Sequence, residues 1–365
     1  MKHDYKKGFL GSGLVVLSGM VYPIVHEHII PKISVVMAVY NKAPYLRQSI
    51  ESVLKQDMQA FELICVDASS TDESLSILNE YSSKDSRITV YSTTYSRIPA
   101  ITKNFGIDRT KGDYVFNLDA DDYLRPDTLR KMYIQAKTTG ADAVIPDLQT
   151  VSSSGQKIPP FISGVKGNRK ILLTNRQAVI ESLDWAIHGF ALWKGHMIRK
   201  IRFEEFGVYS DEYSARVLFF NCRKICFSEG TYFHRFSNQS LTGRISLQTY
   251  DRPETTRRVA SFLDEHSFSQ RNVNGLHFSA FKDCCFLLFL SKNLAAPNLA
   301  EAEKRIKRVY DRIDMHKVRK SVCTLTPGRS ALWSTEGKLK KYLFVLLTFL
   351  KWNSLKRIPM KYFFT

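Results

Sequence analysis

Four short apolar runs punctuate the first third of the chain. They are rich in β-branched residues and hold few polar interruptions, which is typical of strands buried on both faces of a sheet. The expected strands are Ile33–Tyr40, Phe61–Val66, Ile88–Tyr91 and Gly112–Leu118.

Amphipathic stretches separate these runs. In the first of them Leu46, Ile50 and Val53 recur at helical spacing. Strands that alternate with helices predict an α/β fold with a doubly wound, mostly parallel sheet, in which ligands bind at the carboxyl ends of the strands. The expected helices are Tyr45–Gln56, Ser74–Tyr81 and Pro99–Asp108.

The pattern is less regular in the second half of the chain. Val151–Arg169 is expected to be a loop that can hold a hairpin. Helices are expected at Asn175–Ile187 and Asp211–Phe220, and a strand at Thr231–Phe236. Residues 250–320 are expected to form helices, which gives the sheet a C-terminal helical extension.

Polar residues stand where three of the predicted strands end. Tyr40 and Asn41 close the first strand, Asp67 follows the second, and Asp119–Asp122 follow the fourth. Because parallel strands end at the same edge of a sheet, these groups are expected to converge on one crevice. This convergence of distant segments is the strongest functional signal in the sequence.

The segment Asp119-Ala120-Asp121-Asp122 suits a metal–diphosphate site. Carboxylates in a turn can hold Mn²⁺ or Mg²⁺, and the metal then offsets the charge of a diphosphate. The alternative is an acidic surface turn that caps the helix expected to begin near Pro126.

Other polar residues are open to two interpretations each. Asp67 binds a base or ribose hydroxyl, or forms an Asx-turn. Asp211 or Glu212 acts as a general base, or favours the first turn of a helix. Arg235, within His234–Thr242, binds phosphates in a bidentate manner, or belongs to an ordinary loop.

Two residues of the second half, His188 and Trp193, are candidates for lining an acceptor pocket. Core packing is the alternative, and it is favoured for Trp193. The cysteines are expected to be reduced and mostly buried, because only Cys222 and Cys226 resemble metal-site spacing and no second pair accompanies them.

Composition indicates an ordinary globular protein with excess positive charge. The chain has 365 residues, 44% hydrophobic and 24% charged, which excludes a collagen, a disulfide miniprotein and a polytopic membrane protein. Its 53 Lys and Arg against 35 Asp and Glu give a net charge of +18. Residues 303–361 hold sixteen of the basic residues and four of the acidic ones, so the implied acidic partner concerns mainly the tail.

Both ends of the chain are candidates for membrane contact. Gly8–Val25 is largely apolar and follows several lysines, so it is a membrane-contacting segment, a packed extension or a cleaved signal. Tyr342–Leu350 lies among lysines and fits an interfacial helix on anionic lipid, or a terminal helix docked on the domain.

Together, four motifs in residues 31–136 resemble those of an inverting family 2 glycosyltransferase with the GT-A fold. A looser similarity runs from Phe203 to Thr242, where that family has an acidic base motif and an aromatic–Arg segment. The resemblance does not extend to either end of the chain. The motifs are ISVVMAVYN (33–41), VDASSTD (66–72), KNFGI (103–107) and GDYVFNLDADD (112–122).

The resemblance implies a role for each matching position. Asp211 is the expected catalytic base, with Glu212 second, although the family's Glu-Asp pair also aligns with Ser210-Asp211. Asp119 and Asp121 are the expected metal ligands, and Asp122, His188 and Trp193 are expected to face the acceptor. The expected donor-binding residues are Ala38, Tyr40, Asn41, Asp67, Lys103, Asn104, Asp119, Ala120, Asp121 and Arg235.

The expected function is metal-dependent transfer of a sugar, with inversion, from a nucleotide-diphosphate donor such as a UDP-sugar. The acceptor is a hydroxyl of a glycan or lipid-linked molecule in capsule, lipopolysaccharide or similar surface-glycan synthesis. A cytoplasmic location at the inner face of the plasma membrane is expected, on an anionic membrane surface.

Three alternatives remain. One is an inactive nucleotide-binding scaffold, and another is a processive polysaccharide synthase, although the Q-x-x-R-W motif of that group is missing from this sequence. Nucleic-acid binding is not expected, because no recognition motif accompanies the charge. The expected regions are an extension (1–30), a transferase domain (31–245, with a nucleotide-sugar half at 31–136 and an acceptor half at 137–245) and a basic helical region (246–365).

Overall fold

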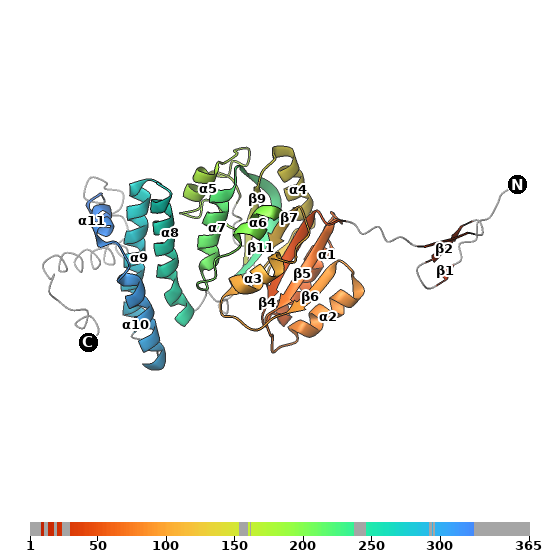
Figure 1. Cartoon of the computed structure of the whole chain (residues 1–365), viewed down its shortest axis with the longest axis horizontal. Coiled ribbons are helices and arrows are strands. Elements are labelled where there is room, and N and C mark those ends of the chain that lie inside the picture. The colour runs from red at the N-terminus through yellow and green to blue at the C-terminus, as the bar shows by residue number, and fades with distance from the viewer. Residues whose placement is uncertain are drawn as a thin grey trace.

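A mixed sheet of eight strands forms the centre of the protein, in the order β6-β5-β4-β7-β10-β9-β11-β8 (Figure 1). Helices pack on both of its faces, because alternate residues of β4 enter two separate hydrophobic cores. The computed structural model describes residues 9–10, 14–17, 20–23, 30–152, 160, 162–236, 246–291, 294 and 296–324.

Four parallel strands make up the first half of this sheet. They are β4 (Ile33–Val39), β5 (Phe61–Asp67), β6 (Ile88–Ser92) and β7 (Tyr114–Asn117). Both faces of β4 and β5 are buried, which is why their sequences are almost uninterruptedly apolar. All four strands that the apolar runs predict are therefore confirmed.

The helices between these strands are confirmed as well. They are α1 (Ala43–Leu54), α2 (Ser74–Lys84) and α3 (Pro99–Ile107). α1 and α3 carry a proline in their first turn, where its missing N–H costs no hydrogen bond. Gly106 allows α3 to approach the sheet closely, since a Cβ there would lie 2.5 Å from Val36 Cγ1.

The second half of the sheet changes direction. β10 (Leu192–Lys194) is antiparallel to both β7 and β9 (Ala143–Ser152), and β11 (Ile225–Phe236) runs parallel to β9. β8 (Tyr123–Leu124) pairs antiparallel with β11 at the edge. Of these strands, the apolar pattern predicts the end of β11 but not β9.

Helices of the second half are α4 (Thr128–Thr139), α5 (Asn175–Glu181), α6 (Gly195–Ile201) and α7 (Ser210–Asn221). α7 matches its prediction. The helix expected to run to Ile187 ends at Glu181 instead, and turns continue the chain to residue 187. The described part of Val151–Arg169 after β9 is a loop, with one bridge between Val165 and Asn168.

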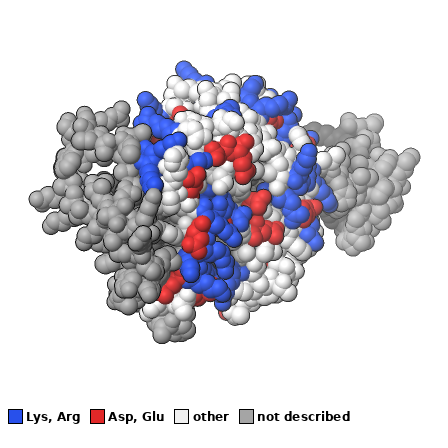
Figure 2. Space-filling view, turned by 60° about the vertical axis from the view of Figure 1, so that its left-hand side comes forward, with Lys and Arg blue, Asp and Glu red and all other residues white. Residues whose placement is uncertain are grey.

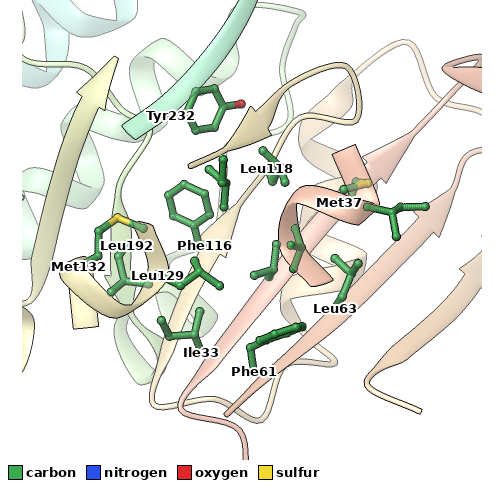
Figure 3. Close-up of a cluster of buried hydrophobic side chains, with 14 of the residues drawn as sticks. Ile33, Met37, Phe61, Leu63, Phe116, Leu118, Leu129, Met132, Leu192 and Tyr232 are labelled. Carbon is green, nitrogen blue, oxygen red and sulfur yellow. The ribbon is translucent and has the colours of Figure 1, made fainter. Parts of the chain in front are cut away.

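One of the buried clusters lies between the sheet and helices α1, α2 and α4 (Figure 3). It includes Ile33, Met37 and Leu63 from the parallel strands and Tyr232 from β11. The rings of Phe116 and Tyr232 lie 6.1 Å apart in it. This cluster joins the two halves of the sheet beneath the edge where β7 ends.

A helical region follows the sheet, as predicted. It consists of a short 3-10 helix, η1 (Leu247–Asp251), then α8 (Arg252–Glu265), α9 (Gln270–Ser291), α10 (Ala296–Tyr310) and α11 (Met315–Thr324). These helices share a core of their own around Tyr250, Phe281 and Ile306. α8 also packs Val259 and Phe262 into the core on the α7 side of the sheet. On the face drawn in Figure 2, basic and acidic groups adjoin, and the basic groups cover more of it.

The structure describes only part of the two end segments for which membrane contact is predicted. Within Gly8–Val25 it describes three short antiparallel strands, β1 (Phe9–Leu10), β2 (Leu14–Leu17) and β3 (Met20–Pro23). Among the described residues, no helix has the length and apolar character needed to cross a bilayer. Tyr342–Leu350 lies outside the described residues, as do Ser240 and Thr242.

Candidate active site

The acidic segment after β7 turns sharply at the carboxyl edge of the sheet. The backbone N–H of Leu118 still donates to Val36 O on β4, and the N–H of Asp122 closes a turn on Asp119 O. The turn separates three carboxylates. Asp122 is 1% exposed, whereas the side chains of Asp119 and Asp121 are 36% and 22% exposed.

Asp122 ties this turn to the neighbouring strand β11. Its Oδ2 accepts a hydrogen bond from the Tyr232 hydroxyl at 2.6 Å, and its Oδ1 accepts one from the Arg235 backbone N–H at 2.7 Å. Burial raises the pKa of Asp122 well above its ordinary value, and the charges of Asp119 and Asp121 raise it further. Both Asp122 oxygens are engaged inside the protein, so it holds its neighbours in place and does not face an acceptor.

Two lysines flank the exposed carboxylates. Lys103 on α3 places its Nζ 3.0 Å from Asp119 Oδ1, and Lys42, just before α1, contacts Asp121 Oδ2. Burial alone would raise the pKa of Asp119, but the charge and hydrogen bond of Lys103, together with the charges of His234 and Lys42, outweigh burial and lower that pKa. Each lysine engages one oxygen of its carboxylate. The turn is therefore an anionic site with cations at its sides.

Arg235 covers the outer side of the turn. Its Nη1 donates to the Asp121 backbone carbonyl at 2.5 Å, and its Nη2 donates to Gln48 Oε1 on α1. The guanidinium lies 5.1 Å from the ring of Tyr45 and 4.9 Å from that of Tyr123. The structure thus brings Arg235 to the acidic turn, at the place where a donor phosphate is expected.

Asp67 lies at the same edge of the sheet, two strands from Asp119. Neighbouring strands are about 4.8 Å apart, so the ends of β5 and β7, with β4 between them, lie about 10 Å apart. Asp67 is 1% exposed, and its Oδ2 accepts from the Ser70 backbone N–H at 3.1 Å. Its buried Oδ1 has no hydrogen-bond partner among the described residues, which is unusual for a carboxylate oxygen and leaves it able to accept from a ligand.

The end of β4 supplies aromatic and polar groups beside Asp67. Tyr40 is 38% exposed and its ring lies 4.3 Å from that of Tyr95. Ala38 is partly exposed and pairs with Val66 on β5. Asn41 turns its side chain onto the neighbouring loop, where its Oδ1 accepts from the Thr71 backbone N–H at 2.8 Å. Asn41 thereby shapes the loop on which a donor base is expected to lie.

Asp211 and Glu212 line a cavity of about 90 Å³ together with Lys103 and Asp119. Both acids lie in the first turn of α7. Asp211 is exposed to solvent, and the protein atoms beside it partly desolvate its carboxylate. This desolvation raises the pKa of Asp211, while the Lys103 charge opposes the rise and the Asp119 charge adds to it.

Lys103 connects the acidic turn to this cavity. Burial lowers the pKa of Lys103, but the carboxylates of Asp119 and Asp211 outweigh the burial, and the pKa is raised. Lys103 therefore stays protonated between a carboxylate that remains ionised and one that favours its proton. Lys103 is thus the residue that links the expected binding site of the nucleotide-sugar donor to the expected base, Asp211.

Two further predicted site residues have structural contacts. Asn104 is 1% exposed; its Nδ2 donates to Phe203 O and Glu205 Oε1, and its Oδ1 accepts from the Phe203 N–H. Trp193 is 1% exposed and packs against Phe219 in the core. The core packing favoured for Trp193 is therefore confirmed, and its alternative placement at an acceptor is wrong, because Trp193 has almost no exposed surface.

His188 does line the cavity, but as a buried residue. Its Nε2 lies 2.9 Å from Pro146 O on β9, and burial lowers its pKa to about 4. His188 is therefore neutral at physiological pH and forms part of the cavity wall.

Three residues of the site escaped the sequence analysis. Lys42 stands directly after Asn41 at the end of the first strand, so its position did offer a signal. Trp185 and Arg216 line the cavity with Asp211. Trp185 was hidden inside a predicted helix, and Arg216 in the middle of α7 has no sequence pattern that marks it.

The acidic turn, its lysines and the four parallel strands lie in a segment that matches a known family. The model of the family described as "Glycosyl transferase family 2" matches residues 34–193, from β4 into β10. The chain carries a family 2 glycosyltransferase domain. Asp211 lies beyond the matched residues, so its assignment depends on the geometry described above.

Relatives of this glycosyltransferase domain are bacterial. An uncharacterized glycosyltransferase of Haemophilus influenzae is 43% identical over 101 residues, which are 28% of this chain and 40% of the relative. Glycosyltransferase GlyG of Streptococcus pneumoniae is 29% identical over 217 residues, 57% of this chain and 72% of the relative. Poly(ribitol-phosphate) beta-glucosyltransferase of Bacillus spizizenii is 35% identical over 127 residues, 34% of this chain and 20% of the relative. The chain thus spans less than half the length of two of these three relatives.

The fold is also found among solved structures. A crystal structure of S. aureus TarS 1-349 in complex with UDP-GlcNAc superposes with a TM-score of 0.59 at 18% sequence identity, covering 78% of this chain and 82% of TarS 1-349. This likeness confirms the predicted α/β fold of GT-A type, with its mixed, mostly parallel sheet.

Proposed function

We propose that this glycosyltransferase moves a sugar, with inversion, from a nucleotide-diphosphate donor to a hydroxyl of a glycan or lipid-linked acceptor. The observation that carries the proposal is the position of Lys103, in contact with Asp119 on one side and close to Asp211 on the other. This arrangement puts a donor-binding carboxylate, a cation for the leaving diphosphate and a proton acceptor in one cavity.

The acidic turn fits a divalent metal. Asp119 and Asp121 supply hard oxygen ligands, and each has only one oxygen engaged by its lysine. No group of three or more acidic, His or Cys side chains placed to hold a metal occurs among the described residues. Mg²⁺ and Mn²⁺ sites of two carboxylates completed by diphosphate and water suit such a pair. When bound, the metal would offset the charge of the diphosphate.

The residues of the chain divide the reaction between them. Lys103, Lys42 and Arg235 would bind the diphosphate and stabilise the negative charge that develops as it leaves. Asp211 would take the proton of the acceptor hydroxyl, whose oxygen then attacks the anomeric carbon from the opposite face. The raised pKa of Asp211 suits this role, because a base needs affinity for the proton that it removes.

The donor side is proposed to bind a uridine nucleotide. The unpartnered Oδ1 of Asp67 and the exposed rings of Tyr40 and Tyr95 are suited to a base and ribose. The TarS structure of the same fold holds UDP-GlcNAc. Relatives named for succinoglycan biosynthesis and for poly(ribitol-phosphate) glucosylation favour surface-glycan synthesis as the setting.

A donor screen tests this function. The purified full chain is incubated with Mn²⁺, a set of UDP-sugars and GDP-mannose, and the released nucleotide is measured with and without acceptor glycans. Release that depends on both the metal and one donor class is expected. Failure of every donor with every metal, while UDP still binds, would instead support the inactive scaffold.

Membrane association is a separate part of the proposal. The last turn of α10 carries Lys307 and Arg308, and the residues that follow this helix carry about half of the chain's excess positive charge. Such clusters bind anionic lipid headgroups at about 1 kcal/mol per basic residue near the surface. Flotation with phosphatidylglycerol liposomes, of the full chain and of a chain ending at residue 335, is expected to differ at low salt. Equal recovery of the two chains with the liposomes would reject membrane association through the tail.

A further inference from the structure

A tryptophan stands at the mouth of the cavity that contains Asp211. Trp185 lines that cavity and is 53% exposed, in contrast to the fully buried Trp193. A large aromatic side chain gains most of its stabilising energy from burial, so a half-exposed Trp contributes little of it to the fold. Its position calls for another explanation.

The backbone at Trp185 is also unfavourable for this residue type. Its φ is +65°, in the left-handed region that bulky side chains rarely adopt. A Gly or Asn there would avoid the strain, and strained residues of this kind cluster at binding and active sites. The turn after α5 therefore holds an exposed Trp in a conformation that does not favour it.

Arg216 fixes this turn to the helix that carries Asp211. Its Nη2 donates to Ser182 O at 2.7 Å, at the start of the turn, and its Nη1 donates to Glu212 O on α7. Arg216 is buried, with 7% of the residue exposed, and its guanidinium lies 5.9 Å from the Trp185 ring. Trp185 and Asp211 are thereby held at a fixed spacing across the cavity.

We propose that Trp185 is a stacking surface for a pyranose ring of the acceptor. The apolar C–H face of the sugar would lie on the indole, and one ring hydroxyl would point at Asp211. An exposed aromatic face beside polar and charged side chains, as at this cavity, is typical of sites that orient a small polar ligand. A linear polyol phosphate has no ring face, so the acceptor is assigned to the saccharides. This inference rests on the proposed function.

The test compares acceptors of the two classes in the full chain. The probes are p-nitrophenyl pyranosides of glucose, galactose and N-acetylglucosamine on one side, and ribitol 5-phosphate on the other. Trp185→Ala is expected to raise the KM of the accepted pyranoside about tenfold or more, with a smaller change in kcat, and Trp185→Phe to restore most of the loss. Ile134→Ala on α4, which removes a similarly exposed side chain far from the cavity residues, is the matched control.

The outcomes separate this inference from the proposed function. If the wild type turns over a pyranoside and Trp185→Ala leaves its KM unchanged, the stacking role is overturned while the transferase stands. The same conclusion follows if ribitol 5-phosphate is the better acceptor. If the wild type does not release nucleotide from any of the donors, the proposed function fails, and the inference fails with it.

A stability measurement excludes a purely structural role. Trp185→Gly relieves the left-handed backbone and removes only a half-exposed side chain, so the melting temperature of the full chain is expected to stay near that of the wild type. The KM of the pyranoside is expected to rise as in Trp185→Ala. A large fall in melting temperature in Trp185→Gly would show that Trp185 is there for the fold.

Discussion

Two pairs of carboxylates at the same edge of the sheet lie in opposite surroundings. Asp119 and Asp121 each contact a lysine, Lys103 and Lys42 respectively. Asp211 and Glu212, across the cavity, form no ion pair in the described part of the chain. Burial raises the pKa of both Asp211 and Glu212, whereas Lys103 brings the pKa of Asp119 below its usual value.

This difference matches two chemical tasks. A carboxylate that binds a cation and a diphosphate works best when it is always ionised, and neighbouring lysines keep it so. A general base must instead take up a proton and hold it, which a partly desolvated site without a direct ion-pair partner favours. The parallel half of the sheet therefore supplies fixed charge, and the second half supplies a group that titrates.

The largest effect is expected from removing the group that titrates, the carboxylate of Asp211. Asp211→Asn keeps the shape of the side chain and cannot accept the proton, so kcat is expected to fall by about 10³-fold or more. The dissociation constant for UDP, measured by calorimetry, is expected to change little, because Asp211 is not among the groups proposed to bind the nucleotide. Wild-type turnover in Asp211→Asn would remove it from the role of base.

Glu212→Gln is the matched control for this variant. Glu212 lies one residue further along α7, and its pKa is raised by burial while the Arg216 charge opposes the rise. A much smaller loss is expected than in Asp211→Asn. If the order of the two losses were reversed, Glu212 would be the base and Asp211 its neighbour.

The fixed charges are tested by the metal. Asp121→Asn and Asp119→Asn remove one proposed ligand each, so kcat/KM is expected to fall about a hundredfold, with a higher Mn²⁺ concentration needed for half-maximal rate. Asp57→Asn, whose carboxylate forms an ion pair with Arg130 on α4, is the control. An unchanged Mn²⁺ requirement in both variants would refute the metal role of the turn.

A third test asks whether Lys103 couples the acidic turn electrostatically to Asp211. Its charge opposes the rise in the pKa of Asp211, so Lys103→Gln should raise that pKa further. The rate is lost as pH falls through the pKa of the base, and the acid limb of the pH–rate profile is therefore expected to move up by about one pH unit. Lys103→Arg keeps the charge and should leave the limb near its wild-type position.

The parallel half of the fold was predictable because each strand is buried on both faces. An uninterrupted apolar run such as Ile33–Val39 indicates such a strand directly, because no position on either face needs to be polar. The acidic turn was predictable for a related reason, since a cluster of carboxylates directly after such a strand has few structural explanations. Its lysine partners were not, because pairing depends on how α3 and α1 pack and not on spacing along the chain.

Two strands of the second half, β9 and most of β11, escaped prediction for local reasons. β9 contains Pro146, which breaks the apolar run, but β10 pairs only with Ala143 and Val144, so the proline lies where no strand adjoins it on that side. β11 shifts register between Phe227 and Thr231, and this bulge interrupts the alternation by which a strand is recognised.

The smallest expected effect concerns the residue that joins the two halves. The Tyr232 hydroxyl on β11 donates to the buried Asp122 in the acidic turn and accepts from the Asp119 N–H at 3.3 Å. Tyr232→Phe leaves the buried carboxylate of Asp122 short of a donor, so the free energy of unfolding is expected to fall by about 1–3 kcal/mol above the folded pKa of Asp122. Tyr81→Phe, which removes a hydroxyl donating to the half-exposed Glu51, is the control.

The pH dependence of that loss identifies its cause. The pKa of Asp122 is raised in the folded state, so its contribution to stability is fully present below the unfolded pKa and is lost as pH rises through the folded one. The Tyr232 hydrogen bond lowers that pKa, so Tyr232→Phe raises it further. Urea unfolding over a series of pH values should therefore show a smaller loss below the folded pKa of Asp122 than above it. A loss that does not change with pH would point to altered packing around Phe116 and not to the carboxylate.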